Sequence, residues 1–339
     1  MKAQVISGQA PGGKRTILAE VLPLDTPILV QIFPVYACNF KCGYCIFSVR
    51  KADRYFISDK VNMDLSLFEK CVDEMTMFSG KIKVLRFVGI GEPLLHKDIA
   101  KMVKYTVSKD VANTVEILTN ASLLTPELSN SLISAGLTRL VVSLQGTTAG
   151  KYEEISNKKI DLENFIENLK YFYDNKGNTQ VYIKIVDTAL GNKEDEQRFY
   201  EIFGDICDTM AIEHTVPIHT GVKFEEVIKE KDSEVTQFGL PVSEAHICPQ
   251  PFFTLQINPD GNVVPCYSFE YPEIIGNCKN QSVYEIWHGK PFQRFRRMML
   301  DGRRKVCKAC DNCNMIKYRF FPEDDLVVDA ERLKKFYEL

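Results

Sequence analysis

Six short apolar runs alternate with amphipathic helical patterns through the first two thirds of this 339-residue chain. The runs lie at residues 27–33, 83–88, 114–119, 139–144, 180–186 and 210–212. Because each run is continuously apolar, it is typical of a parallel strand that is buried on both faces. The alternation predicts an α/β fold, a partial (β/α)6 barrel of the TIM type. The active site of such a barrel lies at the carboxyl ends of its strands.

The remaining segments suggest how the chain is divided. We expect a lead-in at 1–27, the barrel at 28–220, a charged linker at 221–245, a small cysteine-rich α+β domain at 246–320 and a terminal helix at 321–339. Within the cysteine-rich part, the Asn-Pro-Asp-Gly-Asn turn at 258–262 predicts a β-hairpin. Ser282 and Glu285 have the spacing of a capping box, which predicts the start of a helix.

Composition and charge narrow the class of protein. A net charge of −3 offers no general attraction to nucleic acid or to an anionic membrane, and we expect neither as a partner. The first residues lack the apolar core of a signal peptide, and no apolar run is long enough to cross a bilayer. The protein is therefore expected to be cytoplasmic. Eleven cysteines in such a compartment indicate metal binding rather than disulfides.

Three of these cysteines follow the first predicted strand directly. Cys38, Cys42 and Cys45 have the spacing C-x3-C-x2-C. Three thiolates on one short loop can hold three irons of a [4Fe–4S] cluster and leave the fourth iron open to another ligand. A structural zinc site would need four protein ligands, which this loop alone does not supply. By contrast, the isolated Cys71 and Cys207 lie on apolar helical faces and are expected to be core residues.

The cysteine spacing and the preceding strand resemble the signature of the radical S-adenosylmethionine (radical SAM) superfamily. The resemblance implies that the open iron chelates the amino and carboxylate groups of S-adenosylmethionine (SAM). Tyr44, between the second and third cysteines, matches the aromatic position that lies near the adenine in that family.

The turn after the second strand also resembles this family. Gly89, Gly91, Glu92 and Pro93 resemble its GGEP motif, with Ile90 inserted in the usual glycine pattern. The resemblance implies that this backbone binds the SAM amino group while the glutamate holds the loop. Glycines at a strand end let backbone approach a ligand closely. An ordinary Gly-Pro turn is the alternative interpretation.

Further candidates follow the third, fourth and fifth strands. Asn120 precedes Ala121, where the family carries the glycine of a TNG motif. Ser143 matches a position whose hydroxyl meets the SAM ribose or carboxylate, although a purely structural hydroxyl is equally compatible. Gln145 stands where many relatives carry an acid, and alternation puts it on the same face as Ser143. Lys184 is a further inward candidate.

The C-terminal cysteines resemble the SPASM and twitch extensions of radical SAM enzymes. The extension opens with C-x12-G-x4-C and ends with two overlapping C-x2-C pairs. The candidate metal ligands are Cys248, Cys266, Cys307, Cys310 and Cys313. We favour the first four and treat Cys313 as the alternative to one of the last pair. Cys278 is expected in the core. A full SPASM domain would carry a C-x2-C-x5-C-x3-C run, which is absent, so one auxiliary [4Fe–4S] cluster is expected.

The resemblance implies an oxidoreductase mechanism. A flavodoxin or ferredoxin reduces the first cluster, SAM is cleaved to a 5′-deoxyadenosyl radical, and the radical takes a hydrogen atom from the substrate. Only about 27 residues precede the first strand, too few for a peptide-recognition domain. We therefore expect a small substrate like a sugar or aminocyclitol. A peptide- or protein-modifying enzyme is the alternative, and a zinc-ribbon binding protein is a more distant one. The basic stretch at 294–305 is expected to be a solvated helix face.

Overall fold

A computed structural model describes residues 1–6, 15–51, 54, 58, 60–219, 221–227, 234–267 and 270–338. Within these residues ten strands form one sheet, in the order β1-β7-β6-β5-β4-β3-β2-β8-β9-β10. The strands are β1 (Gln4–Val5), β2 (Leu29–Ile32), β3 (Ile82–Phe87), β4 (Ala112–Thr119), β5 (Arg139–Leu144), β6 (Gln180–Val186), β7 (Thr209–Glu213), β8 (Thr254–Ile257), β9 (Asn262–Val264) and β10 (Gly276–Asn277).

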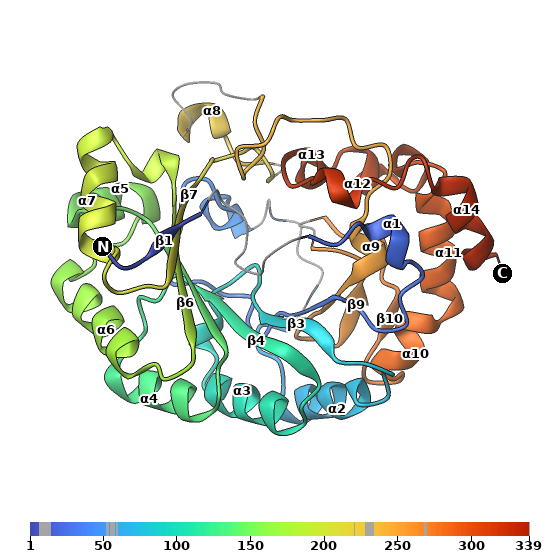
Figure 1. The fold of residues 1–339 in the computed structure, drawn as a ribbon, viewed down its shortest axis with the longest axis horizontal. Coiled ribbons are helices and arrows are strands. Elements are labelled where there is room, and N and C mark those ends of the chain that lie inside the picture. Colours follow the sequence, from blue (N-terminus) through green and yellow to red (C-terminus); the bar gives the residue numbers. More distant parts are fainter. Residues whose placement is uncertain are drawn as a thin grey trace.

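The centre of the sheet is the expected partial barrel. Strands β2 to β7 run parallel in sequence order, with a helix in each connection, and the sheet curves so that its helices lie outside (Figure 1). This confirms the predicted fold class. The helices are α1 (Leu18–Val21), α2 (Leu65–Met75), α3 (Ile99–Ser108), α4 (Pro126–Ser134), α5 (Ala149–Ser156), α6 (Leu162–Asn175), α7 (Lys193–Phe203), α8 (Phe224–Val227), α9 (Gln250–Phe253), α10 (Val283–His288), α11 (Lys290–Met299), α12 (Lys308–Asp311), α13 (Asn314–Tyr318) and α14 (Ala330–Lys334).

Both edges of the six-stranded centre are extended by strands from elsewhere in the chain. The lead-in supplies β1, which pairs in parallel with β7. The predicted C-terminal hairpin forms as β8 and β9, and β8 pairs in parallel with β2. These pairings satisfy backbone groups that an open barrel would otherwise expose at its edges. The two-residue strand β1 had no sequence signal of its own. The expected domain boundaries stay a prediction, and residues 228–233 of the expected linker lie outside the described part.

Local signals place several element ends correctly. The Thr125 hydroxyl accepts a hydrogen bond from the Leu128 N–H at 3.2 Å, with Pro126 as the first residue of α4. The capping box of Ser282 and Glu285 is formed at α10. The terminal helix is shorter than expected and begins at Ala330. In the described chain no helix is long and apolar enough to span a membrane.

One layer of the barrel interior is polar. In-register positions across six neighbouring strands carry polar or charged side chains: Gln256, Gln31, Arg86, Glu116, Arg139 and Gln180. Glu116 is 1% exposed and forms ion pairs with Arg86 and, at 3.0 Å, with Arg139. TIM-type barrels are normally filled by apolar layers. This barrel therefore carries polar and charged side chains where an apolar layer would otherwise lie.

Candidate active site

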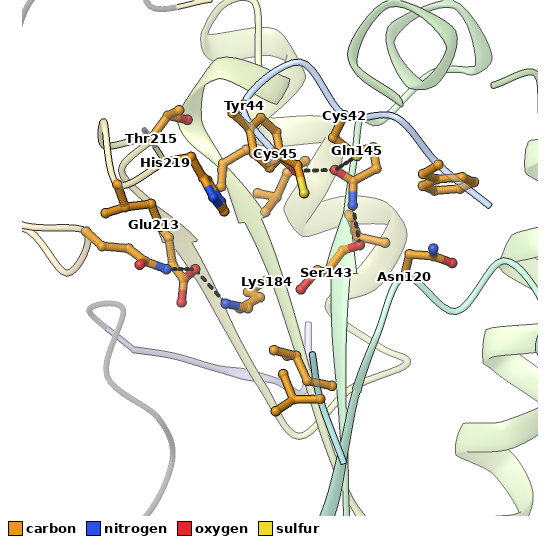
Figure 2. A pocket seen from close by; sticks show the side chains of 18 of the residues that line it. Cys42, Tyr44, Cys45, Asn120, Ser143, Gln145, Lys184, Glu213, Thr215 and His219 are labelled. Carbon is orange, nitrogen blue, oxygen red and sulfur yellow. Dashed lines mark hydrogen bonds and ion pairs between the residues drawn. The ribbon is translucent and has the colours of Figure 1, made fainter. Parts of the chain in front are cut away.

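A cavity of about 230 Å³ lies at the carboxyl ends of the central strands, where the cysteine loop follows β2. Almost all of the residues that were predicted to bind SAM and its cluster line this cavity (Figure 2). The predicted residues that line it are Cys38, Cys42, Tyr44, Cys45, Gly89, Gly91, Glu92, Asn120, Ser143 and Gln145. Pro93 is buried beside this cavity, in the short 3-10 helix Pro93–Leu95.

Cys38, Cys42 and Cys45, the three cysteines of the loop, all line this cavity. Burial raises the pKa of Cys42 well above its usual range, and the charges of Cys45 and Cys38 raise it further. Burial raises the pKa of Cys38 to about 12. All eleven cysteines are free thiols. Thiols that resist ionisation become thiolates beside a cationic group, and the irons of a cluster would supply that charge. The donor set therefore fits an iron–sulfur cluster.

Among the described residues, no three His, Cys, Asp or Glu side chains are arranged around a single ion.

Gln145 connects the cysteine loop to the end of β5. The Tyr44 hydroxyl donates a hydrogen bond to Gln145 Oε1, and Gln145 Nε2 donates to the Ser143 carbonyl at 2.8 Å. The Cys42 thiol lies 3.6 Å from the same Gln145 oxygen. Gln145 thus orients Tyr44 within the cavity wall. Ser143 Oγ makes no hydrogen bond within the described chain, so its hydroxyl is available to a ligand.

Glu92 holds together the turns that follow β3 and β4. Its carboxylate accepts hydrogen bonds from the Leu94 N–H at 2.9 Å, the Thr119 hydroxyl at 2.6 Å and the Asn120 N–H at 2.8 Å. The side chain is buried, which raises its pKa, while the three donors act in the opposite direction. The glutamate of the GGEP-like motif is therefore a loop-holding residue here.

The Glu92→Gln variant is expected to be destabilised by about 1–3 kcal/mol, because one amide N–H₂ must then face a backbone or hydroxyl donor. Urea unfolding of the purified chain measures this change. Glu163→Gln is a matched control, since Glu163 sits exposed in the first turn of α6. Equal stability of the two variants would contradict the loop-holding role.

Asn120 binds the cysteine loop rather than pointing freely into the cavity. Its Nδ2 donates to Asn39 Oδ1 at 3.0 Å, and its Oδ1 accepts from the Ser122 N–H at 2.9 Å. Ala121 adopts a φ of 57°, the left-handed conformation that glycine adopts without strain. Ala121 thus holds, at the position of the glycine in the TNG motif, a conformation that favours glycine.

A chain of polar side chains on the far wall of the cavity was only partly predicted. Lys184 Nζ lies 2.7 Å from Glu213 Oε2, which also accepts from Gln237 Nε2 at 2.7 Å (Figure 2). Arg319 Nε donates to Gln237 Oε1 at 2.6 Å. His219 lines the same wall, where burial and the charge of Arg319 lower its pKa to about 3, so it is neutral. Only Lys184 carried a sequence signal, its place in a predicted strand.

The C-terminal cysteines gather at a second place. A small cavity of about 30 Å³ is lined by Cys248, Cys266, Cys310 and Cys313. Cys307 lies close to Cys310. Burial raises the pKa of Cys266 and of Cys310, and the neighbouring thiols raise both further. The Arg303 side chain helps to hold the loop that carries Cys307, Cys310 and Cys313. Arg303 donates to the carbonyls of Cys310 and Asp311 at 2.8 Å and of Ala245 at 3.0 Å.

Comparison with known proteins gives matches along most of the chain. Residues 32–206 match the radical SAM superfamily, and residues 248–314 match an iron–sulfur cluster-binding domain, SPASM. The SAM-dependent 2-deoxy-scyllo-inosamine dehydrogenase of Niallia circulans is 23% identical over 86% of this chain and 94% of its own length.

Solved structures of similar fold agree. BtrN in complex with AdoMet and 2-DOIA has a TM-score of 0.54 at 20% identity, over 85% of this chain and 93% of its own. Streptococcus suis SuiB bound to S-adenosylmethionine has a TM-score of 0.64 at 17% identity, over 89% of this chain and 74% of its own. The family match spans more than half of the chain and coincides with the strands that surround the cysteine loop. This chain is a radical SAM enzyme with a C-terminal SPASM iron–sulfur domain.

Proposed function

We propose that this enzyme oxidises a small molecule held inside the barrel, between the SAM site and the C-terminal cysteines. The observation that carries the proposal is a second cavity of about 290 Å³ in the barrel interior. It adjoins the cavity of about 230 Å³ in which we place SAM, the SAM cavity. The two cavities share part of their lining: Val88, Leu118, Lys184, Glu213, Gln237, Tyr267 and Arg319. A ligand in the inner cavity would therefore lie next to the proposed SAM site.

When bound, the reduced cluster and SAM supply a radical that takes one hydrogen atom from a substrate carbon. A carbinol becomes a carbonyl when it loses that hydrogen atom, one proton and one electron. The residues of this chain would hold the reactants in place. Cys38, Cys42 and Cys45 would hold the cluster, and Ser143 and the turn at 89–93 would bind SAM. A flavodoxin or ferredoxin would deliver the first electron, and the C-terminal cluster would accept the one from the substrate.

The size of the inner cavity supports a small substrate. Pockets for small molecules are commonly 300–1,000 Å³, and the inner cavity of about 290 Å³ lies at the low end. The similarity to an aminocyclitol dehydrogenase supports a carbinol as the oxidised group. A peptide substrate would need an open groove. The inner cavity is instead lined by residues of seven strands, β2 to β8, together with the C-terminal residues Pro249, Phe253 and Phe321.

The auxiliary cluster is proposed to use Cys248, Cys266, Cys310 and Cys313. Sequence spacing favours Cys307 over Cys313, whereas the small cavity is lined by Cys313 and not by Cys307. Two [4Fe–4S] clusters hold about eight irons per chain. After anaerobic reconstitution, Cys313→Ala is expected to fall to about four irons and Cys307→Ala to keep about eight. The reverse result would assign Cys307 as the ligand.

The substrate class is tested by the stimulation of SAM cleavage. The reconstituted enzyme, SAM and dithionite are incubated with an extract of the source organism, split by ultrafiltration into small-molecule and peptide fractions. We expect the small-molecule fraction to raise the release of 5′-deoxyadenosine above the rate without substrate. Stimulation by the peptide fraction alone would overturn the proposal in favour of a peptide-modifying enzyme.

A further inference from the structure

Two arginines that line the inner cavity have guanidinium nitrogens that are available to bind a ligand. Arg86 lies on β3 and makes one side-chain hydrogen bond, from Nε to Glu116. Arg319 follows α13 and makes one, from Nε to Gln237 Oε1. In the part of the chain that the structure describes, the terminal nitrogens of both side chains have no hydrogen-bond partner. Both arginines line the inner cavity, and the Arg86 side chain is 27% exposed there.

The two charges lie close enough to affect each other. Burial lowers the pKa of Arg319, and the charge of Arg86 lowers it further. The Arg319 guanidinium also lies 5.6 Å from the centre of the Tyr267 ring, whose own pKa is lowered by both arginines against the larger effect of burial. Two like charges near each other raise the free energy of the site, and an anion bound beside both would lower it.

The whole lining of the cavity has an excess of positive charge. Its described part holds five cationic side chains and three carboxylates: Arg15, Arg86, Arg139, Lys184 and Arg319 against Glu116, Glu213 and Asp324. Every one of these carboxylates already has a cationic partner: Arg86 and Arg139 for Glu116, Lys184 for Glu213 and Arg15 for Asp324. An amino group on a substrate would have to displace one of these cations.

We propose that the inner cavity binds an oxyanion, a carboxylate or phosphate of the substrate, between the guanidinium groups of Arg86 and Arg319. This inference rests on the proposed function and names the substrate class. Guanidinium groups bind such anions through two parallel N–H···O bonds. Arg319 and Tyr267 line both cavities, so an anion held there leaves the rest of the substrate beside the SAM site.

The remaining wall offers hydrogen bonds to the body of such a substrate. The hydroxyls of Tyr182 and Thr254 are buried, line the cavity and have no hydrogen-bond partner among the described residues. Tyr182 is 3% exposed and Thr254 is 1% exposed. Buried hydroxyls without partners are uncommon in folded proteins, and a polar ligand in the cavity would satisfy them. The substrate is thus expected to carry polar groups as well as the anion.

The test is calorimetric binding to the reconstituted full chain without reductant. The probes are inorganic phosphate, succinate and, as the neutral counterpart of succinate, succinamide. We expect the wild type to bind phosphate or succinate at least about tenfold more tightly than succinamide. Which of the two anions binds distinguishes a phosphate-bearing from a carboxylate-bearing substrate. Failure of the wild type to bind either anion at tens of millimolar would overturn the proposal.

Substitutions test whether Arg86 and Arg319 bind the anion. Arg319→Gln and Arg86→Gln are each expected to weaken anion binding at least about tenfold. Arg319→Lys keeps the charge but not the paired donors, and its affinity is expected between those of wild type and Arg319→Gln. Arg294→Gln removes one charge from an exposed position on α11 and should bind as the wild type does. Equal binding by all four variants would overturn the proposal.

The experiment distinguishes a failure of anion binding from misfolding of a variant and from a failure of the proposed function. Arg86→Gln removes an ion pair with the buried Glu116 and is expected to impair folding. Replacing Arg319 removes only its bond to Gln237 and its contact with the Tyr267 ring, so the Arg319 variants decide in that case. The binding assay needs no radical chemistry. A wild type that releases 5′-deoxyadenosine but binds neither anion overturns this inference alone. A wild type that binds an anion but releases none overturns the proposed function.

Discussion

The Cys42→Ala variant is expected to lose about four irons per chain and all reductive cleavage of SAM. Cys42 is the most buried of the three cysteines in the loop, and it lines the cavity of about 230 Å³ together with Cys38 and Cys45. The C-x3-C-x2-C loop offers three thiolates, so removing one leaves the cluster with two. Iron and acid-labile sulfide counts after anaerobic reconstitution measure the first loss, and 5′-deoxyadenosine in the presence of dithionite measures the second.

Cys71→Ala is the matched control for this experiment. Cys71 is 1% exposed and packs on α2 among core side chains, outside both cysteine groups. The variant loses a similar buried volume but no proposed ligand, so about eight irons and wild-type SAM cleavage are expected. If Cys42→Ala kept the iron content and activity of Cys71→Ala, the assignment of the first cluster to this loop would be wrong.

The Gly91→Ala variant is expected to lose SAM binding. A Cβ atom at this position would lie 2.2 Å from the Val35 carbonyl oxygen and 2.9 Å from that of Ala37. Both oxygens belong to the segment that leads into the cysteine loop. Relief of such a clash requires the two turns to separate and costs about 2 kcal/mol or more. Because SAM and its cluster are proposed to lie between these turns, a shift of either turn disturbs the site. Equilibrium dialysis with labelled SAM measures the loss.

Gly150→Ala controls for the added methyl group. Gly150 lies in α5 with nothing within 4 Å of an added Cβ, and its SAM binding is expected to equal that of the wild type. Equal SAM affinity of Gly91→Ala and the wild type would show that the Gly89–Pro93 turn does not form the SAM site.

The central fold could be read from the sequence because its signals are local. Strand β6 (Gln180–Val186) was predicted to the residue, since its apolar run is bounded on both sides by turn residues. The edge strands were not, because a two-residue strand such as β1 is defined by its partner β7 and not by its own composition. The parallel pairing of β8 with β2 likewise depends on the barrel having an open edge there.

Some residues of the candidate site could likewise be predicted from the sequence, and others could not. The cysteines and the Gly89–Pro93 turn were found because ligand spacing and glycine positions leave a trace along the chain. Arg319, Gln237 and Tyr267 left none, since they reach the barrel only through the C-terminal segment that folds against it. Arg86 and Arg139 lie within predicted strands, but their inward direction and shared partner Glu116 appear only once the strands are in register. Charge inside a barrel is a property of register, which a single sequence does not specify.

The most direct test of radical SAM chemistry in this chain is a single anaerobic assay. Reconstituted wild-type enzyme is mixed with SAM and dithionite, and 5′-deoxyadenosine and methionine are quantified by liquid chromatography and mass spectrometry. If the chain carries out this chemistry, both products appear in equal amounts, both require dithionite, and Cys42→Ala forms neither. An intact cluster that binds SAM and is reduced, yet releases no 5′-deoxyadenosine, would contradict it.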